Sequence, residues 1–542
     1  MAGSILIEVF GKIAFSFTRS VMEHYHPEEP EFTIESFGLN PLESTGREWY
    51  YRPVDELIYQ EYSNEETTST NHYHYHYLAV RGINVRLINA CSVEEHEEIQ
   101  DEKPEERAMA WKQLRPSFMK TICKSMYIGA LISLITASVI GAIYLLFSYF
   151  MYKTLLSCAF VPERFITESM QWIITVWDLT VSLIFHFGLF CNTLFLFRRH
   201  QLHGLKKMLF LISFAMYCLH ALYCVILQAV NKPYAWLSPL YRIPIYLFIA
   251  MGPFLQLWYL AKSFGVRSGK KMIIHLCKLM LPGFLTYTIA FVAIYFVYPA
   301  YQKQKGNGKL LIAIFAPLIG VIAKVLSRIS VQQLWNITHP GYSYVLLVPL
   351  YFGAAVVCRL LQAELDGLLY IVVLGVIHGI TEVVERSTMV LIDHFCHQLW
   401  KRKSAPWGSF RTPRRERLMA DIAIISMMFE SIAIVSVNGF LFFYQFIYLL
   451  NDSFSNLILS LVIYTTVPLV IEWFFTSVSL AIETRYQNMP VMAVWRWQWK
   501  RHVLVAVVNA ILLSAWSSGN LLNAVSSEFI QQRPKLNRTC KM

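Results

Sequence analysis

Long apolar segments recur through the last four-fifths of the chain, and each is close to the ~20 residues that a helix needs to cross a bilayer. We predict eleven spans, near residues 127–152, 170–197, 208–230, 241–264, 272–298, 310–327, 343–361, 368–391, 420–450, 457–481 and 502–523. The span near 310–327 contains Lys324 and has a re-entrant segment as its alternative. The pattern predicts an all-α polytopic membrane protein, with a transmembrane bundle over residues 111–523 and a tail over 524–542.

Residues 368–417 have the most informative pattern. The segment begins apolar on every side, becomes striped, and ends in a run with seven Lys or Arg between residues 401 and 417, which is typical of a span entering the cytoplasm. One broad helical face collects polar and small residues: Gly375, His378, Thr381, Glu382, Glu385, Arg386, Asp393 and Cys396. Charged groups at bilayer depth are costly, so this face should contact protein or water. Alternatively, Glu382 and Arg386, four residues apart, only stabilise the helix.

The region before the first span divides into two parts. Residues 1–22 have the pattern of an amphipathic helix lying on the inner leaflet, or of one packed on the protein's own spans. They lack the pattern of a secretory signal peptide. Residues 23–110 form an acidic cytoplasmic region, partly β or disordered, and residues 21–110 hold 20 acids against 6 bases. Its HYHYHY run at 72–77 would place three His on one strand face, which either binds metal or is simply solvated; we predict no metal site.

The charges of the loops predict the orientation. With the N-terminus inside, the inner loops carry 20 Lys and Arg and the outer loops carry 8. This bias predicts a cytoplasmic N-terminus and an outside C-terminus. The formal net charge of +11 then reflects loops facing anionic lipid, so we expect the lipid bilayer as a partner and no nucleic acid.

Further ionisable residues lie deep in other apolar segments. Asp178 and His186 share one span, whereas Glu430 and Glu472 come from two others. Carboxyl and imidazole groups can bind and release protons, as a proton channel or proton-coupled carrier requires. The alternative for each is a hydrogen bond or ion pair that holds the bundle together. Lys278, Lys324 and Arg359 lie near span ends, where long side chains are expected to extend to the membrane interface.

Prolines interrupt successive spans, at Pro244, Pro253, Pro282, Pro317, Pro349 and Pro468. Broken helices expose backbone groups that can coordinate ions, so these prolines are compatible with transport. Membrane helices also tolerate proline for purely structural reasons.

Signatures of enzymes are absent from the sequence. It contains no HExxH, GxSxG, Walker A or Rossmann pattern, and its ten cysteines are scattered without a CxxC. We therefore predict no enzymatic activity, no cofactor and no catalytic residue.

Two hypotheses of different classes follow. The preferred one is a transporter or channel for protons or small cations, with a polar path formed by Asp178, His186, His378, Glu382, Glu385, Arg386, Glu430 and Glu472. The alternative is a multi-pass receptor or scaffold that acts through its acidic N-terminal region and the basic loop at 401–417. A membrane-embedded enzyme acting on lipid would need a metal or nucleophile that the sequence does not display.

Overall fold

The computed structural model describes residues 118–151, 167–197, 202–230, 239–263, 269–334, 338, 340–365, 367–401, 413–448, 454–485, 487, 489 and 491–532. Within these ranges every regular element is a helix. The elements are α6 (Phe118–Ile135), η3 (Thr136–Ile140), α7 (Gly141–Met151), α8 (Glu168–Leu196), α9 (Lys206–Ala229), α10 (Pro239–Ser263), α11 (Gly269–Val292), η7 (Ala293–Val297), α12 (Tyr298–Gln302), α13 (Gly306–Gln332), α14 (Pro340–Ser343), η8 (Tyr344–Leu346), α15 (Val348–Ala363), α16 (Leu368–Lys401), α17 (Pro413–Tyr448), α18 (Phe454–Arg485) and α19 (Val491–Gln532).

The described residues include nine helical segments that are long and apolar enough to cross a membrane. They coincide with nine of the eleven predicted spans, because lipid leaves the backbone few alternatives to helix. The segment predicted near 310–327 belongs to α13, a continuous helix of 27 residues. The span predicted near 343–361 falls on α15, which has only 16 residues, and the last predicted span lies within α19.

Several predictions concern residues outside the described ranges. These are the interfacial helix at 1–22, the acidic region at 23–110 with its histidine run, and the middle of the basic loop at 401–417. The described end of that loop is helical, because α17 begins at Pro413 and includes Arg414, Arg415 and Arg417. Proline suits this position, since the first turn of a helix has no partner for its N–H groups.

The chain divides into two compact units. The first consists of Met1–Gly129, Glu382–Ile424 and Phe475–Trp499, and the second of Ala130–Thr381, Ile425–Phe474 and Lys500–Met542. In the first unit α6 approaches α18 closely, because a Cβ added at Gly129 would lie 2.7 Å from Ser477 Oγ. The Arg485 guanidinium in the same unit lies over the Phe118 ring, 5.4 Å from its centroid.

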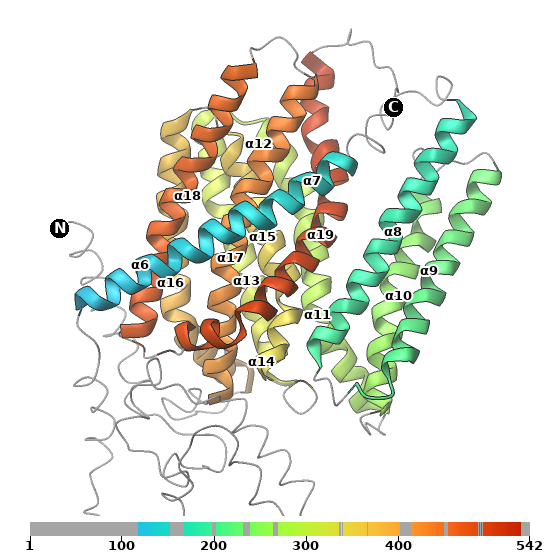
Figure 1. Cartoon of the computed structure of the whole chain (residues 1–542), viewed down its shortest axis with the longest axis horizontal. Coiled ribbons are helices and arrows are strands. Elements are labelled where there is room, and N and C mark those ends of the chain that lie inside the picture. The colour runs from blue at the N-terminus through green and yellow to red at the C-terminus, as the bar shows by residue number, and fades with distance from the viewer. Residues whose placement is uncertain are drawn as a thin grey trace, which may run out of the picture. The chain divides into compact units, whose positions relative to one another are not determined.

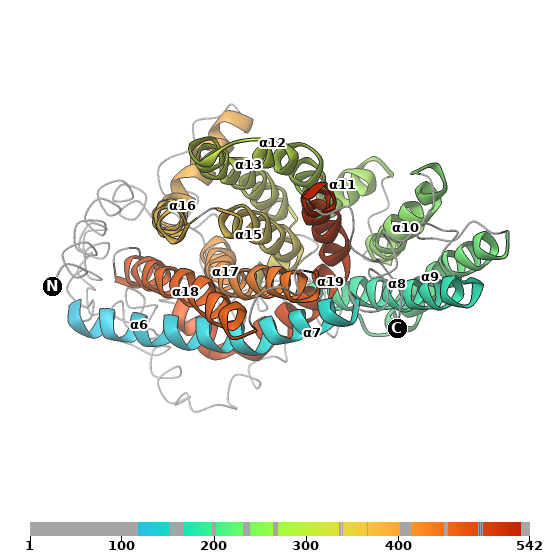
Figure 2. The same cartoon turned by 90° about the horizontal axis from the view of Figure 1, so that it is seen from above.

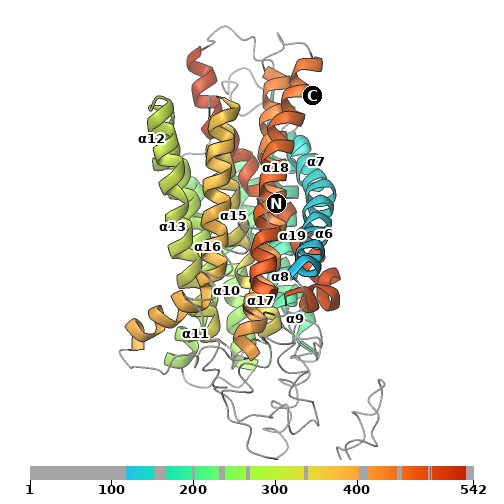
Figure 3. The same cartoon turned by 90° about the vertical axis from the view of Figure 1, so that its left-hand side faces the viewer.

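The short helix α15 lies at the centre of the second unit. It packs against α11 and α13, and its Phe352 ring stacks on Phe429 of α17 at 4.8 Å between centroids. The Tyr144 ring of α7 makes an edge-to-face contact with Phe352, with 6.1 Å between ring centroids. Figures 2 and 3 show α13, α15 and α16 running side by side. Neighbouring helices surround α15, so a polar residue on it must find its partners inside the protein.

Three helices of the second unit, α8, α9 and α10, form a neighbouring group (Figure 1). Their core consists of buried leucines, including Leu209 of α9 and Leu257 and Leu260 of α10. Asn192 of α8 and Asn509 of α19 exchange side-chain hydrogen bonds of 3.0 Å, which tie this group to α19. Hydrogen bonds between polar side chains are typical of contacts between membrane helices and contribute about 0.6–2 kcal/mol each.

The prolines do not break their helices. Five of the six, at Pro244, Pro253, Pro282, Pro317 and Pro468, lie inside continuous helices, and Pro349 lies in the first turn of α15. Pro299 follows the π-helical η7, where the wider turn accommodates the missing N–H. The prolines therefore expose no unwound backbone in the described helices, and they do not support the ion-coordinating role considered above.

Glycines allow several helices of the second unit to pack closely. A methyl group added at Gly188 of α8 would overlap the side chain of Leu512 of α19, and one added at Gly439 of α17 would overlap Leu145 of α7. Small residues at such crossings are typical of membrane bundles, where packing replaces the hydrophobic effect as the driving force.

We expect Gly188→Ala to destabilise the protein by about 1–3 kcal/mol, because Leu512 is buried and must move to admit the methyl group. Gly283→Ala is the matched control, since a methyl group there meets nothing within 4 Å. Thermal unfolding of the purified protein in detergent would measure both changes. Equal stability of the two variants would contradict the close α8–α19 contact, and Leu512→Ala should partly rescue Gly188→Ala.

Candidate functional site

A buried arginine between two glutamates is the main polar feature of the second unit. The Nη2 atom of Arg359 in α15 lies 2.8 Å from Glu430 Oε2 in α17 and 2.5 Å from Glu472 Oε2 in α18. Arg359 Nε also donates to Glu430 Oε2 at 3.1 Å. The prediction that Arg359 extends to the membrane interface is wrong: its side chain is only 4% exposed. Two inward-facing acids provide a better environment than the lipid interface for a planar guanidinium.

A second layer of contacts orients the arginine. Its Nη1 donates to Gln362 Oε1 at 2.8 Å, one turn further along α15, and Gln362 Nε2 donates to the Ile371 carbonyl of α16 at 2.9 Å. Gly375 makes room for this amide, because a Cβ there would lie 3.1 Å from Gln362 Nε2. Gly375 was placed on the polar face of this helix from its periodicity, and the structure gives that position a packing reason.

Two further ionisable groups belong to the same cluster. His378 of α16 lies close enough to interact with the charges of Arg359, Glu430 and Lys324. Lys324 of α13 lies over the Tyr351 ring, 4.9 Å from its centroid. We call Lys324, Arg359, His378, Glu430 and Glu472 the five-helix cluster, since α13, α15, α16, α17 and α18 contribute one residue each.

The cluster combines two basic groups, two acids and one imidazole. Its charges balance when His378 is neutral and both acids are ionised, so the gain or loss of one proton changes the net charge of a buried site. In a low-dielectric interior such a change is strongly coupled to the arrangement of neighbouring charges. The chemistry available to the cluster is therefore proton exchange, or exchange of a small cation for Arg359 on a glutamate.

Three residues of the cluster lie near the middle of their membrane spans. Glu430 lies near the middle of the span Arg415–Phe443, Glu472 near the middle of Ser455–Arg485, and His378 near the middle of Leu368–Asp393. The middle of a membrane span is the costliest place for charge and the usual place for transporter binding sites.

Within the described residues, a separate hollow between α11, η7, α15 and α19 is lined mainly by apolar side chains, such as Val297, Leu360 and Trp516, and by none of the predicted path residues.

Asp178 and His186, the path residues predicted in α8, make their contacts elsewhere. His186 Nε2 lies 3.3 Å from His220 Nδ1 of α9, and Asp178 lies near Cys224 of the same helix. The structure thus gives these two residues partners in α9, apart from the acids of α17 and α18. His220 and Cys224 were not singled out from the sequence.

The remaining path residues, Glu382, Glu385 and Arg386, lie in the first unit. Arg386 makes a two-pronged contact with Glu483 of α18, with Nε–Oε1 at 2.8 Å and Nη2–Oε2 at 2.7 Å. Its contact with Glu382 is longer, at 3.6 Å, and has the i,i+4 geometry expected from the sequence. Glu385 is buried on the same helix. The principal partner, Glu483, was missed because it lies just beyond the span predicted at 457–481.

These features define the class of the protein. Long apolar helices with buried ion pairs among them make the chain a multi-pass helical membrane protein. No protein-family model, curated protein sequence or solved structure matches the chain.

Proposed function

We propose that the protein transports protons or small cations across a membrane, and that the five-helix cluster is its binding site. The observation that carries the proposal is the convergence of His378, Glu430 and Glu472 around Arg359. Intramembrane ionisable groups that meet near mid-span are expensive to retain, and transport sites have this composition. In this proposal Arg359 forms ion pairs with the two acids in one state, and a proton or cation takes its place on a carboxylate in another.

The burial of the cluster favours a carrier over an open pore. Glu472 is 3% exposed and Arg359 4%, whereas Glu430 is 17% exposed and is the acid closest to access. A substrate must therefore enter through a rearrangement that separates Arg359 from at least one glutamate. Such alternation between two closed arrangements is the basis of carrier transport.

The proposal keeps the orientation and the non-enzymatic character predicted from the sequence. The N-terminus is cytoplasmic and the C-terminus outside, in accordance with the distribution of Lys and Arg among the loops. Asp178, His186, Glu382, Glu385 and Arg386 act outside the cluster, as supporting contacts rather than as substrate ligands.

We expect Glu430→Gln to lower proton or cation flux in proteoliposomes by at least about tenfold, equivalent to ~1.4 kcal/mol. The substitution keeps the shape of the side chain and removes the charge that a proton or cation would neutralise. Flux would be followed with a pH-sensitive dye and with a panel of monovalent cations, at several pH values. Glu168→Gln is the matched control, because Glu168 is an exposed carboxylate in the first turn of α8.

Two outcomes would contradict the proposal. One is wild-type flux no higher than that of empty liposomes for protons and every cation tested, which would favour the receptor or scaffold hypothesis. The other is equal flux in Glu430→Gln and wild type, when size-exclusion chromatography shows that both proteins are folded.

A further inference from the structure

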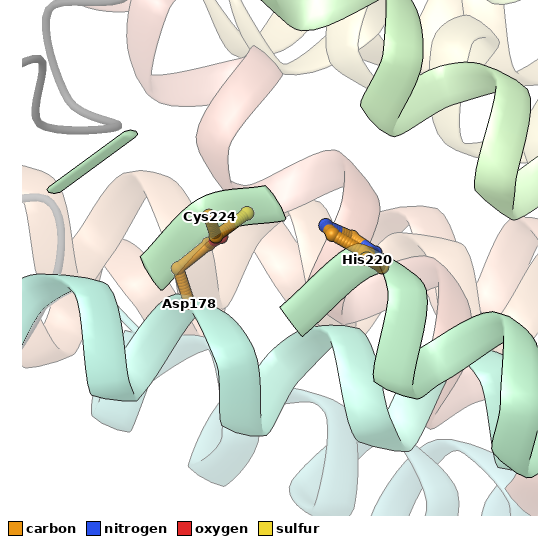
Figure 4. Close-up of side chains that lie close together, drawn as sticks. All are labelled: Asp178, His220 and Cys224. Atoms are coloured by element: carbon orange, nitrogen blue, oxygen red, sulfur yellow. The ribbon is translucent and has the colours of Figure 1, made fainter. Parts of the chain in front are cut away.

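The α8–α9 helix pair contains a cluster of three buried groups of different chemistry. A carboxylate oxygen of Asp178 in α8, a ring nitrogen of His220 and the sulfur of Cys224, both in α9, all lie within 4.8 Å of one another. His220 and Cys224 are four residues apart, so one face of α9 presents both. Figure 4 shows the His220 ring extending toward Cys224 and Asp178, with a nitrogen at its leading edge.

Two polar atoms of this cluster lack hydrogen-bond partners in the described part of the chain. Asp178 Oδ2 and His220 Nε2 are buried and have no hydrogen-bond partner among the described residues. Asp178 is 7% exposed, His220 1% and Cys224 3%. Arg242 of α10 interacts with the charge of Asp178 at longer range, without an ion pair between them in the described part of the chain. Buried groups of this kind nearly always have a partner, so their convergence points to a bound ligand.

His186 prepares His220 for this role. Its Nε2 lies 3.3 Å from His220 Nδ1, so a proton on His220 Nδ1 can be donated to His186. This tautomer leaves the lone pair of His220 Nε2 free in the cluster. Metal-binding histidines commonly have such an outer partner, which fixes the tautomer and the ring orientation.

We propose that Asp178, His220 and Cys224 bind a divalent transition-metal ion of the Zn²⁺ type. One oxygen, one nitrogen and one sulfur donor suit this borderline ion better than Mg²⁺ or Ca²⁺, which prefer oxygen. A carboxylate and a thiolate balance two positive charges, so the ion and its ligands are neutral together inside an apolar bundle. Three protein ligands leave a fourth position of a tetrahedral ion for water or another small ligand.

The site does not depend on the transport proposal. Its residues come from α8 and α9, and those of the five-helix cluster come from other helices. Either proposal can therefore fail alone.

Cobalt substitution of the full-length protein in detergent tests the site. Co²⁺ bound to a thiolate gives a near-ultraviolet charge-transfer band, which nitrogen and oxygen ligands alone do not give. We expect this band, and about one equivalent of Zn²⁺ per chain after loading and desalting, as for a single site. Cys224→Ser and Asp178→Asn should each abolish the band or lower metal content at least about tenfold, since even the loss of an outer-shell partner of a metal ligand costs about 10- to 100-fold in affinity.

Cys218→Ser is the matched control, since Cys218 is an exposed cysteine of the same helix. All proteins would carry His72→Ala, His74→Ala and His76→Ala and a tag without histidine, so that the N-terminal histidine run contributes no metal. Loss of the band in Cys224→Ser but not in Cys218→Ser supports the site. Absence of the band in the parent protein, or its persistence in Cys224→Ser, overturns it. Unchanged elution on size exclusion shows that each variant is folded.

Discussion

Arg359→Met is expected to destabilise the protein by about 3–5 kcal/mol, the usual cost of removing one partner from a buried ion pair. The variant leaves Glu430 and Glu472 facing each other without the guanidinium that lies 2.8 Å and 2.5 Å from them. It also removes the hydrogen bond from Arg359 to Gln362, and the amide of Gln362 in turn links α15 to α16. Unfolding of the purified protein in mixed micelles, followed by circular dichroism, would measure the loss.

The triple variant Arg359→Met, Glu430→Gln and Glu472→Gln separates charge from packing. Because neither glutamate is left charged without the guanidinium, most of the lost stability should return. Arg496→Met is the control for loss of an exposed arginine and should change stability by less than ~1 kcal/mol, because the contacts of an exposed charge contribute little. A stable Arg359→Met protein, or a triple variant no better than the single one, would contradict the assignment of Arg359 as the charge that holds the two acids.

The sequence predicts the helices of this protein well and their contacts poorly. Nine of the eleven predicted spans coincide with helices long and apolar enough to cross a membrane, because a run of apolar residues in lipid has essentially one way to satisfy its backbone. The other two fall on the short helix α15 and within α19. The ends are less accurate: α17 begins at Pro413 rather than near residue 420, and α19 continues to Gln532. Polar residues near the ends of a span are acceptable in the interface, so hydropathy does not mark where a helix stops.

Arg359 shows why the candidate site could be predicted only in part. Glu430, Glu472 and His378 were identified from the cost of placing them at mid-span, and this cost depends on sequence alone. Arg359 lies near the end of its span, and only the packing of α15 among its neighbours makes it a buried residue. Which acids it meets depends on tertiary structure, and the pattern of a single sequence does not determine those contacts.

Glu483 could have been found by following a helical stripe. It lies eleven residues after Glu472, which is three turns, and Thr476 and Ser479 lie between them on the same side of α18. All four side chains are buried. A buried polar stripe that continues beyond the apolar part of the helix indicates that other protein segments, rather than lipid, pack against this side of α18.

Glu483→Met is expected to cost about 3–5 kcal/mol, whereas Glu382→Met should cost less than ~1 kcal/mol, although both acids contact Arg386. Glu483 is 1% exposed and makes two short hydrogen bonds to the guanidinium, so its loss leaves a buried charge without its main partner. The contact of Glu382 with Arg386 is longer, at 3.6 Å within the same helix, and Glu382 is more exposed, at 13%. Chemical unfolding of both variants would measure the difference.

The double variant Arg386→Met and Glu483→Met completes the test, because removing both charges together should recover much of the stability lost by Glu483→Met alone. A larger loss for Glu382→Met than for Glu483→Met would reverse the assignment and make the contact within α16 the dominant one. If Glu483→Met instead loses more stability than Glu382→Met, as expected, the main role of Arg386 is to join α16 to α18. Its effect on transport would then follow from the packing of those helices, and Glu382→Gln should leave flux through the five-helix cluster close to that of the wild type.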